Sequence, residues 1–273
     1  MATSAADGPS NLTLRILSAL TLGPIVLAMA YAGDVYFLIL IGLIVYFLGL
    51  EWSSICTEKM FGFNSAVMCA GLVGTVILIG FEQVNFAFYA LALTALVVAI
   101  SGGLAMQGAW LACGVIFIGV SFTALILMRS DVDLDRNFIF WLIAVVWSSD
   151  TGAYIFGRLI GGPKLAPTIS PKKTWAGFYG GLVCCAAAGA ATAIIVDAAN
   201  IWVLSIFSAV VGLMAQMGDL LESWLKRKFS VKDSGNIIPG HGGLFDRVDG
   251  LMTASLLCAV VWGFEKDWIA KWL

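Results

Sequence analysis

Long apolar runs separated by short polar connections occupy most of this sequence and restrict what the chain can fold into. A helix that spans a bilayer needs about 20 predominantly apolar residues. Soluble domains are about one quarter charged, whereas here 12% of the residues are charged and the mean hydropathy is +0.96. The sequence therefore predicts an all-α, polytopic integral membrane protein with about nine transmembrane helices. These spans are expected at residues 14–32, 35–50, 65–81, 86–101, 109–128, 138–157, 177–196, 201–221 and 250–264.

The distribution of basic residues predicts how the chain is oriented in the membrane. An odd number of spans places the two termini on opposite sides. With the N-terminus in the cytoplasm, most of the 15 Lys and Arg residues lie on the cytoplasmic side, as the positive-inside rule requires. The two long charged loops, 158–176 and 222–249, then both face the cytoplasm. The chain length and the lack of signal-peptide or transit-peptide features predict the inner membrane of a bacterium.

Composition argues against several other classes of protein. The net charge of −2 provides no basic field that would attract nucleic acid. The six cysteines form no CxxC pairs and lie mostly within apolar runs, so we expect neither a disulfide framework nor a zinc site. Residues 1–137 carry no chemical motif, and we expect them to serve packing, dimerisation or lipid access. Residues 138–273 are expected to carry the active site.

Charged residues within or beside the later apolar runs give the first indication of function. Asp150 follows an apolar run, and an ionisable residue at such a depth is costly unless it meets a cation or water. Lys172 and Lys173 precede the span expected at 177–196, where a helix N-terminus disfavours cations and favours an anion. Alternatively, the preceding span ends at Trp147 and the two lysines are ordinary flanking charges.

Two further segments add carboxylates to the same side of the membrane. Asp219, Glu222 and Lys226 follow the spacing of one helical face, although Glu222 and Lys226 also have the spacing of an exposed ion pair on a helix surface. Asp246 and Asp249 are spaced i, i+3 and share a face if a span begins there. We therefore predict a cluster of carboxylates at helix ends, formed by Asp150, Asp219, Asp246 and Asp249.

This combination of charges is typical of a site for phosphoryl or nucleotidyl transfer. Carboxylate oxygens and water suit Mg²⁺, which commonly binds one or two carboxylates together with substrate phosphates. The only histidine, His241, stands among glycines and acts either as a base or ligand or as a hydrogen-bonding residue of the turn. Basic residues expected around the carboxylates are Lys172, Lys173, Lys226, Arg227, Lys232 and Arg247.

The segment 223–249 also carries a specific signature. It consists of Ser223, Leu225-Lys226-Arg227, Lys232-Asp233, Gly235, Ile238-Pro239, His241-Gly242-Gly243-Leu244 and Asp246-Arg247-Val248-Asp249. WSSDTGAY at 147–154 and SPKKTWAG at 170–177 belong to the same pattern. In these segments the chain resembles the phosphatidate cytidylyltransferases, also called CDP-diacylglycerol synthases. The N-terminal half resembles that family only as a multi-span helical bundle of fitting length.

The resemblance implies a membrane-embedded, Mg²⁺-dependent enzyme, often helped by K⁺ and found as a homodimer. It implies that CTP and phosphatidic acid are converted to CDP-diacylglycerol and pyrophosphate. Asp219 and Asp246 would be the main metal carboxylates, with Asp150 and Asp249 nearby. Catalytic roles are then expected for Asp219, Asp246, Asp249, Lys226, Arg227 and His241, and substrate-binding roles for Lys172, Lys173, Ser223, Lys232, Asp233 and Arg247.

Three alternatives compete with this interpretation. A CTP-dependent lipid kinase of the dolichol or phytol kinase type would handle the same nucleotide but transfer its γ-phosphoryl group. A transporter for ions or anionic metabolites would also need charged residues within the membrane, but it would often show an internal repeat, which we do not find. A structural membrane protein would leave the clustered charges unexplained.

Overall fold

The computed structural model describes residues 11–103, 106–198, 200–235, 237, 242–265, 269 and 271. Within this part of the chain it contains nine helices and one two-stranded sheet, so the all-α prediction is confirmed. The helices are α1 (Asn11–Ala32), α2 (Asp34–Thr57), α3 (Phe63–Gly80), α4 (Val84–Ser101), α5 (Met106–Arg129), α6 (Asp135–Leu159), α7 (Trp175–Ile195), α8 (Ile201–Lys228) and α9 (Phe245–Phe264), and the strands are β1 (Lys164–Ala166) and β2 (Ser170–Thr174).

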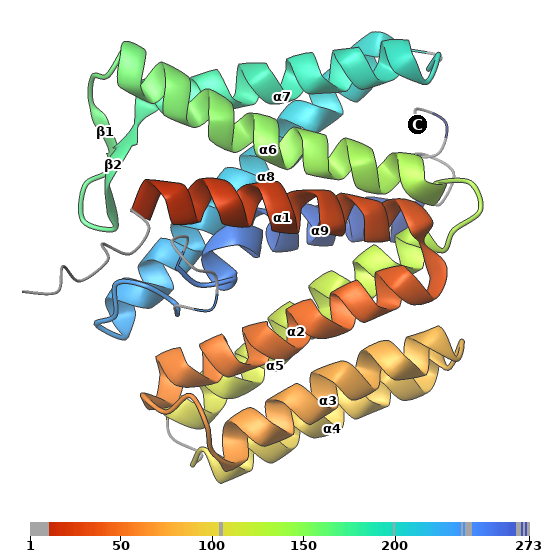
Figure 1. Ribbon diagram of the computed structural model, residues 1–273, viewed down its shortest axis with the longest axis vertical. Coiled ribbons are helices and arrows are strands. Elements are labelled where there is room, and N and C mark those ends of the chain that lie inside the picture. The colour runs from red at the N-terminus through yellow and green to blue at the C-terminus, as the bar shows by residue number, and fades with distance from the viewer. Residues whose placement is uncertain are drawn as a thin grey trace, which may run out of the picture.

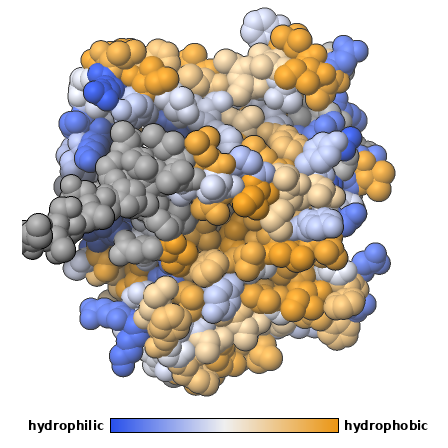
Figure 2. Space-filling view, viewed as in Figure 1, coloured by the Kyte–Doolittle hydropathy of each residue, from blue (hydrophilic) through white to orange (hydrophobic). Residues whose placement is uncertain are grey.

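Eight of the described helices, α2 to α9, are long and apolar enough to cross a membrane, and α1 adds a shorter apolar segment, Leu20–Ala32. Large apolar side chains such as Leu93, Tyr179 and Ile206 are more than half exposed on the outside of the bundle. Hydrophilic residues gather at two opposite margins of the molecule, with an apolar surface between them (Figure 2). This distribution is that of a protein surrounded by lipid.

The helices run back and forth across the molecule, with α3 and α4 at one edge and α6 and α7 at the other (Figure 1). Helix α9 packs against both α8 and α5, and α2 packs against α5. One continuous apolar core therefore joins the N-terminal helices to the C-terminal ones, and it includes Leu48, Phe122, Trp141 and Met252. Helix α9 connects the two halves and, as described below, begins at the candidate site.

Both charged segments lie at the same end of the bundle. The start of α1, the hairpin of β1 and β2, the end of α8 and the start of α9 all appear at the left of Figure 1, and α9 runs from there toward the opposite end. The predicted placement of segments 158–176 and 222–249 on one side is thus confirmed for their described residues, whereas the assignment of that side to the cytoplasm stays a prediction.

The charged segments are more regular than predicted. Segment 158–176 was expected to be a loop, but its centre is an antiparallel hairpin that pairs Lys164 with Thr174 and Ala166 with Ser170. Its strands are short and lack the alternating apolar pattern by which strands are predicted. Gly161 and Gly162 precede the hairpin with φ angles of 67° and 93°, which glycine adopts without the strain of a Cβ atom.

Helices α8 and α9 extend beyond the predicted spans, to Lys228 and back to Phe245 respectively. These additional turns carry Lys226, Arg227, Asp246, Arg247 and Asp249 of the signature. The prediction ended each span where charge begins, but here the charges are paired within the protein, so the helices continue through them. The alternative in which a span ends at Trp147 is wrong, because α6 continues to Leu159.

Candidate active site

Three carboxylates from two helices form a compact acidic cluster. Oxygen atoms of Asp219, Glu222 and Asp249 all lie within 4.8 Å of one another. Glu222 is buried, and the other two side chains are partly exposed. Because like charges at this separation repel strongly in a site shielded from water, the acidic cluster is suited to hold a cation.

A glycine allows α8 and α9 to approach closely at the level of the acidic cluster. A Cβ atom on Gly218 would overlap the backbone oxygen of Asp249 and the hydroxyl of Thr253. The Thr253 hydroxyl donates to the Met214 backbone oxygen at 2.8 Å and thus ties α9 to α8 one turn further along. This close crossing places Asp249 beside the carboxylates of α8.

Asp150 and Lys173 extend the acidic cluster toward α6 and the hairpin. Lys173 Nζ lies 2.6 Å from Asp219 Oδ2, an ion pair that lacks the angles of a hydrogen bond. Asp150 lies within electrostatic range of Asp219, Lys173 and Arg247. The predicted convergence of α6 with the ends of α8 and α9 is therefore confirmed for Asp150, Asp219 and Asp249.

The hairpin positions Lys173 through the start of α7. Thr174 is the N-cap of α7, and its hydroxyl accepts a hydrogen bond from the Gly177 N–H at 3.1 Å. Threonine is a preferred N-cap residue, so the last residue of β2 also begins the helix. Neighbouring residues of a strand point to opposite sides: Lys173 is partly buried against Asp219, whereas Lys172 is exposed.

Lys226 joins the acidic cluster to Asp246. Its Nζ lies 2.6 Å from Glu222 Oε1 and 2.8 Å from Asp246 Oδ1. The second oxygen of Asp246 accepts a hydrogen bond from the Gly243 N–H at 3.2 Å. The alternative of an exposed surface pair between Glu222 and Lys226 is wrong, because only 4% and 14% of these side chains are exposed. Asp246 is not one of the three carboxylates whose oxygens lie within 4.8 Å of one another, but it lies within side-chain hydrogen-bonding range of Glu222 and so adjoins the acidic cluster.

The other predicted site residues lie at the edge of this arrangement. The Arg227 Nε–H donates to the Ile169 backbone oxygen at 3.4 Å and links α8 to the hairpin. Ser223 is partly buried one residue after Glu222. The predicted residue His241 lies outside the described residues. The exposed members of the predicted set are Asp150, Lys172, Arg227, Lys232, Asp233 and Arg247.

Sequence analysis missed one buried carboxylate of this region, Glu51 of α2. Its two oxygens accept hydrogen bonds from the Leu244 N–H at 2.8 Å and from the Phe245 N–H at 2.7 Å. Ser234 donates its hydroxyl to the same carboxylate at 3.4 Å. Glu51 lies in an apolar run without a neighbouring motif, so its single charge was the only available signal.

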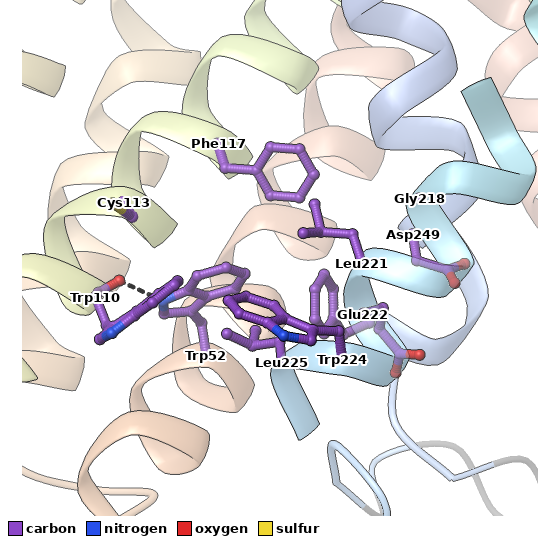
Figure 3. A pocket seen from close by; sticks show the side chains of 11 residues that line it. Trp52, Trp110, Cys113, Phe117, Gly218, Leu221, Glu222, Trp224, Leu225 and Asp249 are labelled. Atoms are coloured by element: carbon purple, nitrogen blue, oxygen red, sulfur yellow. Dashed lines mark hydrogen bonds between the residues drawn. The ribbon is translucent and has the colours of Figure 1, made fainter. Parts of the chain in front are cut away.

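An aromatic cavity of about 160 Å³ opens beside the acidic cluster. Trp52, Trp110 and Trp224 line one end, and Glu222 and Asp249 stand at the other (Figure 3). The Trp52 indole N–H donates to the Trp110 backbone oxygen at 2.8 Å, which holds α2 against α5 at the cavity wall. The remaining wall is mostly apolar and comprises Cys113, Phe117, Gly218, Leu221, Leu225 and Phe245.

This geometry combines two chemical environments. The acidic cluster, with Lys173 and Lys226 in contact, can hold a cation and polyanionic oxygens. The aromatic cavity can hold an apolar group that adjoins them. A site of this kind suits a substrate with a phosphate at one end and a hydrocarbon at the other.

Comparison with known proteins agrees with the predicted resemblance. The family model described as the cytidylyltransferase family matches residues 13–264. The chain is 38% identical to the phosphatidate cytidylyltransferase of Brucella suis biovar 1 (strain 1330) over 251 residues, which cover 91% of this chain and 92% of that protein. It is 45% identical to the phosphatidate cytidylyltransferase of Staphylococcus haemolyticus (strain JCSC1435) over 148 residues, 54% of this chain and 56% of that protein. The chain therefore belongs to the cytidylyltransferase family.

Proposed function

We propose that this chain is a phosphatidate cytidylyltransferase, which transfers the cytidylyl group of CTP to phosphatidic acid and releases pyrophosphate. The observation that carries the proposal is the contact between the acidic cluster, its lysines and the aromatic cavity at one end of a helical bundle. The names of the relatives in Brucella and Staphylococcus support the choice of substrates.

The two substrates reach such a site from different phases. CTP arrives from water, whereas phosphatidic acid remains in the bilayer with its phosphate at the surface. A charged site at the end of a membrane bundle serves both. The cavity next to Glu222 and Asp249 supports a position for the apolar part of the lipid beside its reacting phosphate.

The acidic cluster fits Mg²⁺, because it offers hard oxygen donors from three side chains that lie close together. We assign Asp219, Glu222 and Asp249 as the residues that would hold the ion. Bound there, Mg²⁺ would neutralise phosphate charge and polarise phosphoryl oxygens. We also propose that Asp150 and Asp246 contribute to metal binding and that K⁺ assists the reaction.

In the reaction, a phosphate oxygen of phosphatidic acid attacks the α-phosphorus of CTP. The new P–O bond forms as the bond between the α-phosphorus and its bridging oxygen breaks, and that electron pair leaves with pyrophosphate. A phosphate monoester is already anionic near neutral pH, so the attack needs no strong base. Lys173 and Lys226 would offset the repulsion between the polyanions and stabilise the charge on the leaving group.

Two further features complete the proposal. The site faces the cytoplasm, because CTP is found there and the two segments rich in Lys and Arg lie at the same end of the bundle as the site. The enzyme acts as a homodimer, as the resemblance to the family implies.

Doubly labelled CTP tests the reaction class. With purified protein in phosphatidate-containing vesicles, we expect label from the α-phosphate in the lipid and label from the γ-phosphate in pyrophosphate. Label from the γ-phosphate in the lipid would instead identify a kinase. Counterflow of an anion without CTP turnover would identify a transporter.

The metal assignment predicts a specific effect of Asp249→Asn. Losing one of three ligand charges should raise the Mg²⁺ concentration for half-maximal activity by about tenfold or more, and should lower kcat. The control is Asp197→Asn, which makes the same change at an exposed position after α7. Equal Mg²⁺ titration curves for the two variants would contradict the assignment.

A further inference from the structure

Helix α9, which carries Asp246 and Asp249, begins without a capping side chain of its own. Its N-cap residue is Leu244, which makes no side-chain capping bond among the described residues. The first N–H groups of a helix have no partner within the helix and need an acceptor. Ser, Thr, Asp or Asn normally supply it from the N-cap position, so α9 requires an acceptor from elsewhere in the chain.

Glu51 supplies that acceptor from the N-terminal half. Its carboxylate receives the Leu244 and Phe245 N–H groups at 2.8 and 2.7 Å, and these donors lie 193 and 194 positions further along the chain. A carboxylate at a helix N-terminus is also favoured by the helix dipole. The side chain of Glu51 is 1% exposed, and a buried carboxylate costs several kcal/mol unless donors surround it as they do here.

Two glycines of the signature lie close to the same carboxylate. A Cβ atom on Gly235 would lie 2.8 Å from Glu51 Oε1, and one on Gly243 would overlap the Ser234 hydroxyl, which donates to Glu51, and would lie 2.9 Å from Glu51 Oε1. Neither glycine has a positive φ angle, so backbone conformation does not require glycine at these positions. Glycine is required at Gly235 by the close approach of the backbone to the Glu51 carboxylate, and at Gly243 by its close approach to that carboxylate and to the Ser234 hydroxyl.

The contact reaches the catalytic residues through one helical turn. The Gly243 N–H, next to the clamped Leu244, donates to Asp246, and Asp246 in turn binds Lys226. Asp249 follows one turn later in α9 and belongs to the acidic cluster. The position of the α9 N-terminus therefore sets where both aspartates lie relative to α8.

We propose that Glu51 is a positioning residue that clamps the start of α9 and thereby holds Asp246 and Asp249 in register with the carboxylates and Lys226 of α8. The proposal rests on the proposed function, because the effect on chemistry is measured as cytidylyl transfer. It gives the N-terminal half a direct part in the site. Glu51 itself does not contact the reacting atoms.

Two substitutions of Glu51, compared with one control substitution, test the clamp. Glu51→Gln keeps one acceptor oxygen and loses the charge, and Glu51→Leu removes both acceptors. The matched control is Glu58→Gln, the same change at an exposed residue seven positions later. Hydrogen bonds to a charged acceptor are stronger than those to a neutral one, so loss of the charge weakens the clamp. We therefore expect kcat to fall about tenfold or more for Glu51→Gln and further for Glu51→Leu, with the KM for CTP changed less than about threefold.

A readout independent of activity is tryptic cleavage after Lys232, an exposed residue shortly before the clamped segment. Release of the clamp should speed this cleavage in both Glu51 variants and leave it unchanged in Glu58→Gln. Wild-type kcat together with wild-type resistance to trypsin in Glu51→Gln would overturn the proposal. If the wild-type protein transfers no cytidylyl group but the Glu51 variants are still cleaved faster than it is, the clamp is upheld and the proposed function is refuted.

A substitution at another position keeps the proposal testable if the Glu51 variants fail to fold. Gly235→Ala leaves the carboxylate intact but places a methyl group against it. We expect a lower kcat and faster cleavage after Lys232 in this variant. Because aspartate is one methylene shorter, Glu51→Asp should make room for that methyl group, so the double variant should lose less activity than the two single losses combined. Full activity of Gly235→Ala would overturn the proposal.

Discussion

At the scale of single residues, Lys226 has the most consequential position in the site. One ammonium group neutralises two carboxylates, Glu222 from its own helix and Asp246 from α9. All three side chains are largely buried. Removing one partner of a buried ionic group leaves an uncompensated charge, which costs more than the intact group contributes.

The substitution Lys226→Met tests this arrangement. It should destabilise the protein by about 3–5 kcal/mol, since two close carboxylates would remain without their cation. Thermal unfolding in detergent and cytidylyl transfer are the measurements. Adding Glu222→Gln should restore part of the stability but none of the activity, and full recovery of both would contradict the assigned role.

The two adjacent lysines of β2 should differ in their effects. Lys172 is exposed, so Lys172→Ala should raise the KM for CTP and leave kcat nearly unchanged if it contacts the triphosphate. Lys173 contacts Asp219 at 2.6 Å, so Lys173→Ala should also lower kcat by about tenfold or more. Steady-state kinetics in both substrates distinguish the two. Identical parameters for the two variants would contradict the strand geometry.

At the scale of elements, the site depends on how closely α8 and α9 cross. Gly218 leaves the space in which the Asp249 backbone and the Thr253 hydroxyl lie. Packed helices cannot absorb an additional methyl group at such a contact without moving apart. Small shifts between these helices would separate Asp219 from Asp249.

Replacing Gly218 with alanine tests whether the site depends on this close crossing of α8 and α9. Gly218→Ala should destabilise the protein by about 1–3 kcal/mol and abolish most activity. The control Gly74→Ala introduces the same methyl group where nothing lies within 4 Å, and should be neutral or slightly stabilising because alanine favours helix. Unfolding midpoints and cytidylyl transfer should separate the two variants, and equal midpoints would argue against the close crossing.

At the scale of the whole molecule, the proposed orientation has a direct test. Lys232 and Val132 are exposed residues at opposite ends of the bundle. Cysteine introduced at residue 232 should react with a membrane-impermeant maleimide only from the cytoplasmic side, and cysteine at residue 132 only from the other side. Unmodified protein with its native cysteines provides the background. Reversed labelling would refute the orientation but leave the fold unaffected.

The apolar pattern predicted the number and order of the helices, because burial in lipid demands long apolar runs. The clustering of Asp150, Asp219 and Asp249 was predictable because these residues lie near the ends of apolar runs that reach the same side of the membrane. Glu51 was not predictable, since its donors are backbone N–H groups far along the chain. Glu222 was taken for an exposed residue in one alternative, because its burial depends on the arrival of α9. The hairpin was missed because its pairing depends on turns rather than on apolar alternation.

The tryptophans around the aromatic cavity have a practical consequence. Trp52, Trp110 and Trp224 are three of only ten in the chain, and indole emission responds to nearby quenchers. The protein therefore contains its own fluorescent reporter of this compartment. Phosphatidic acid brominated near the glycerol should dim that signal, and replacing Trp224 with phenylalanine should reduce the response while leaving the emission of the distant tryptophans intact.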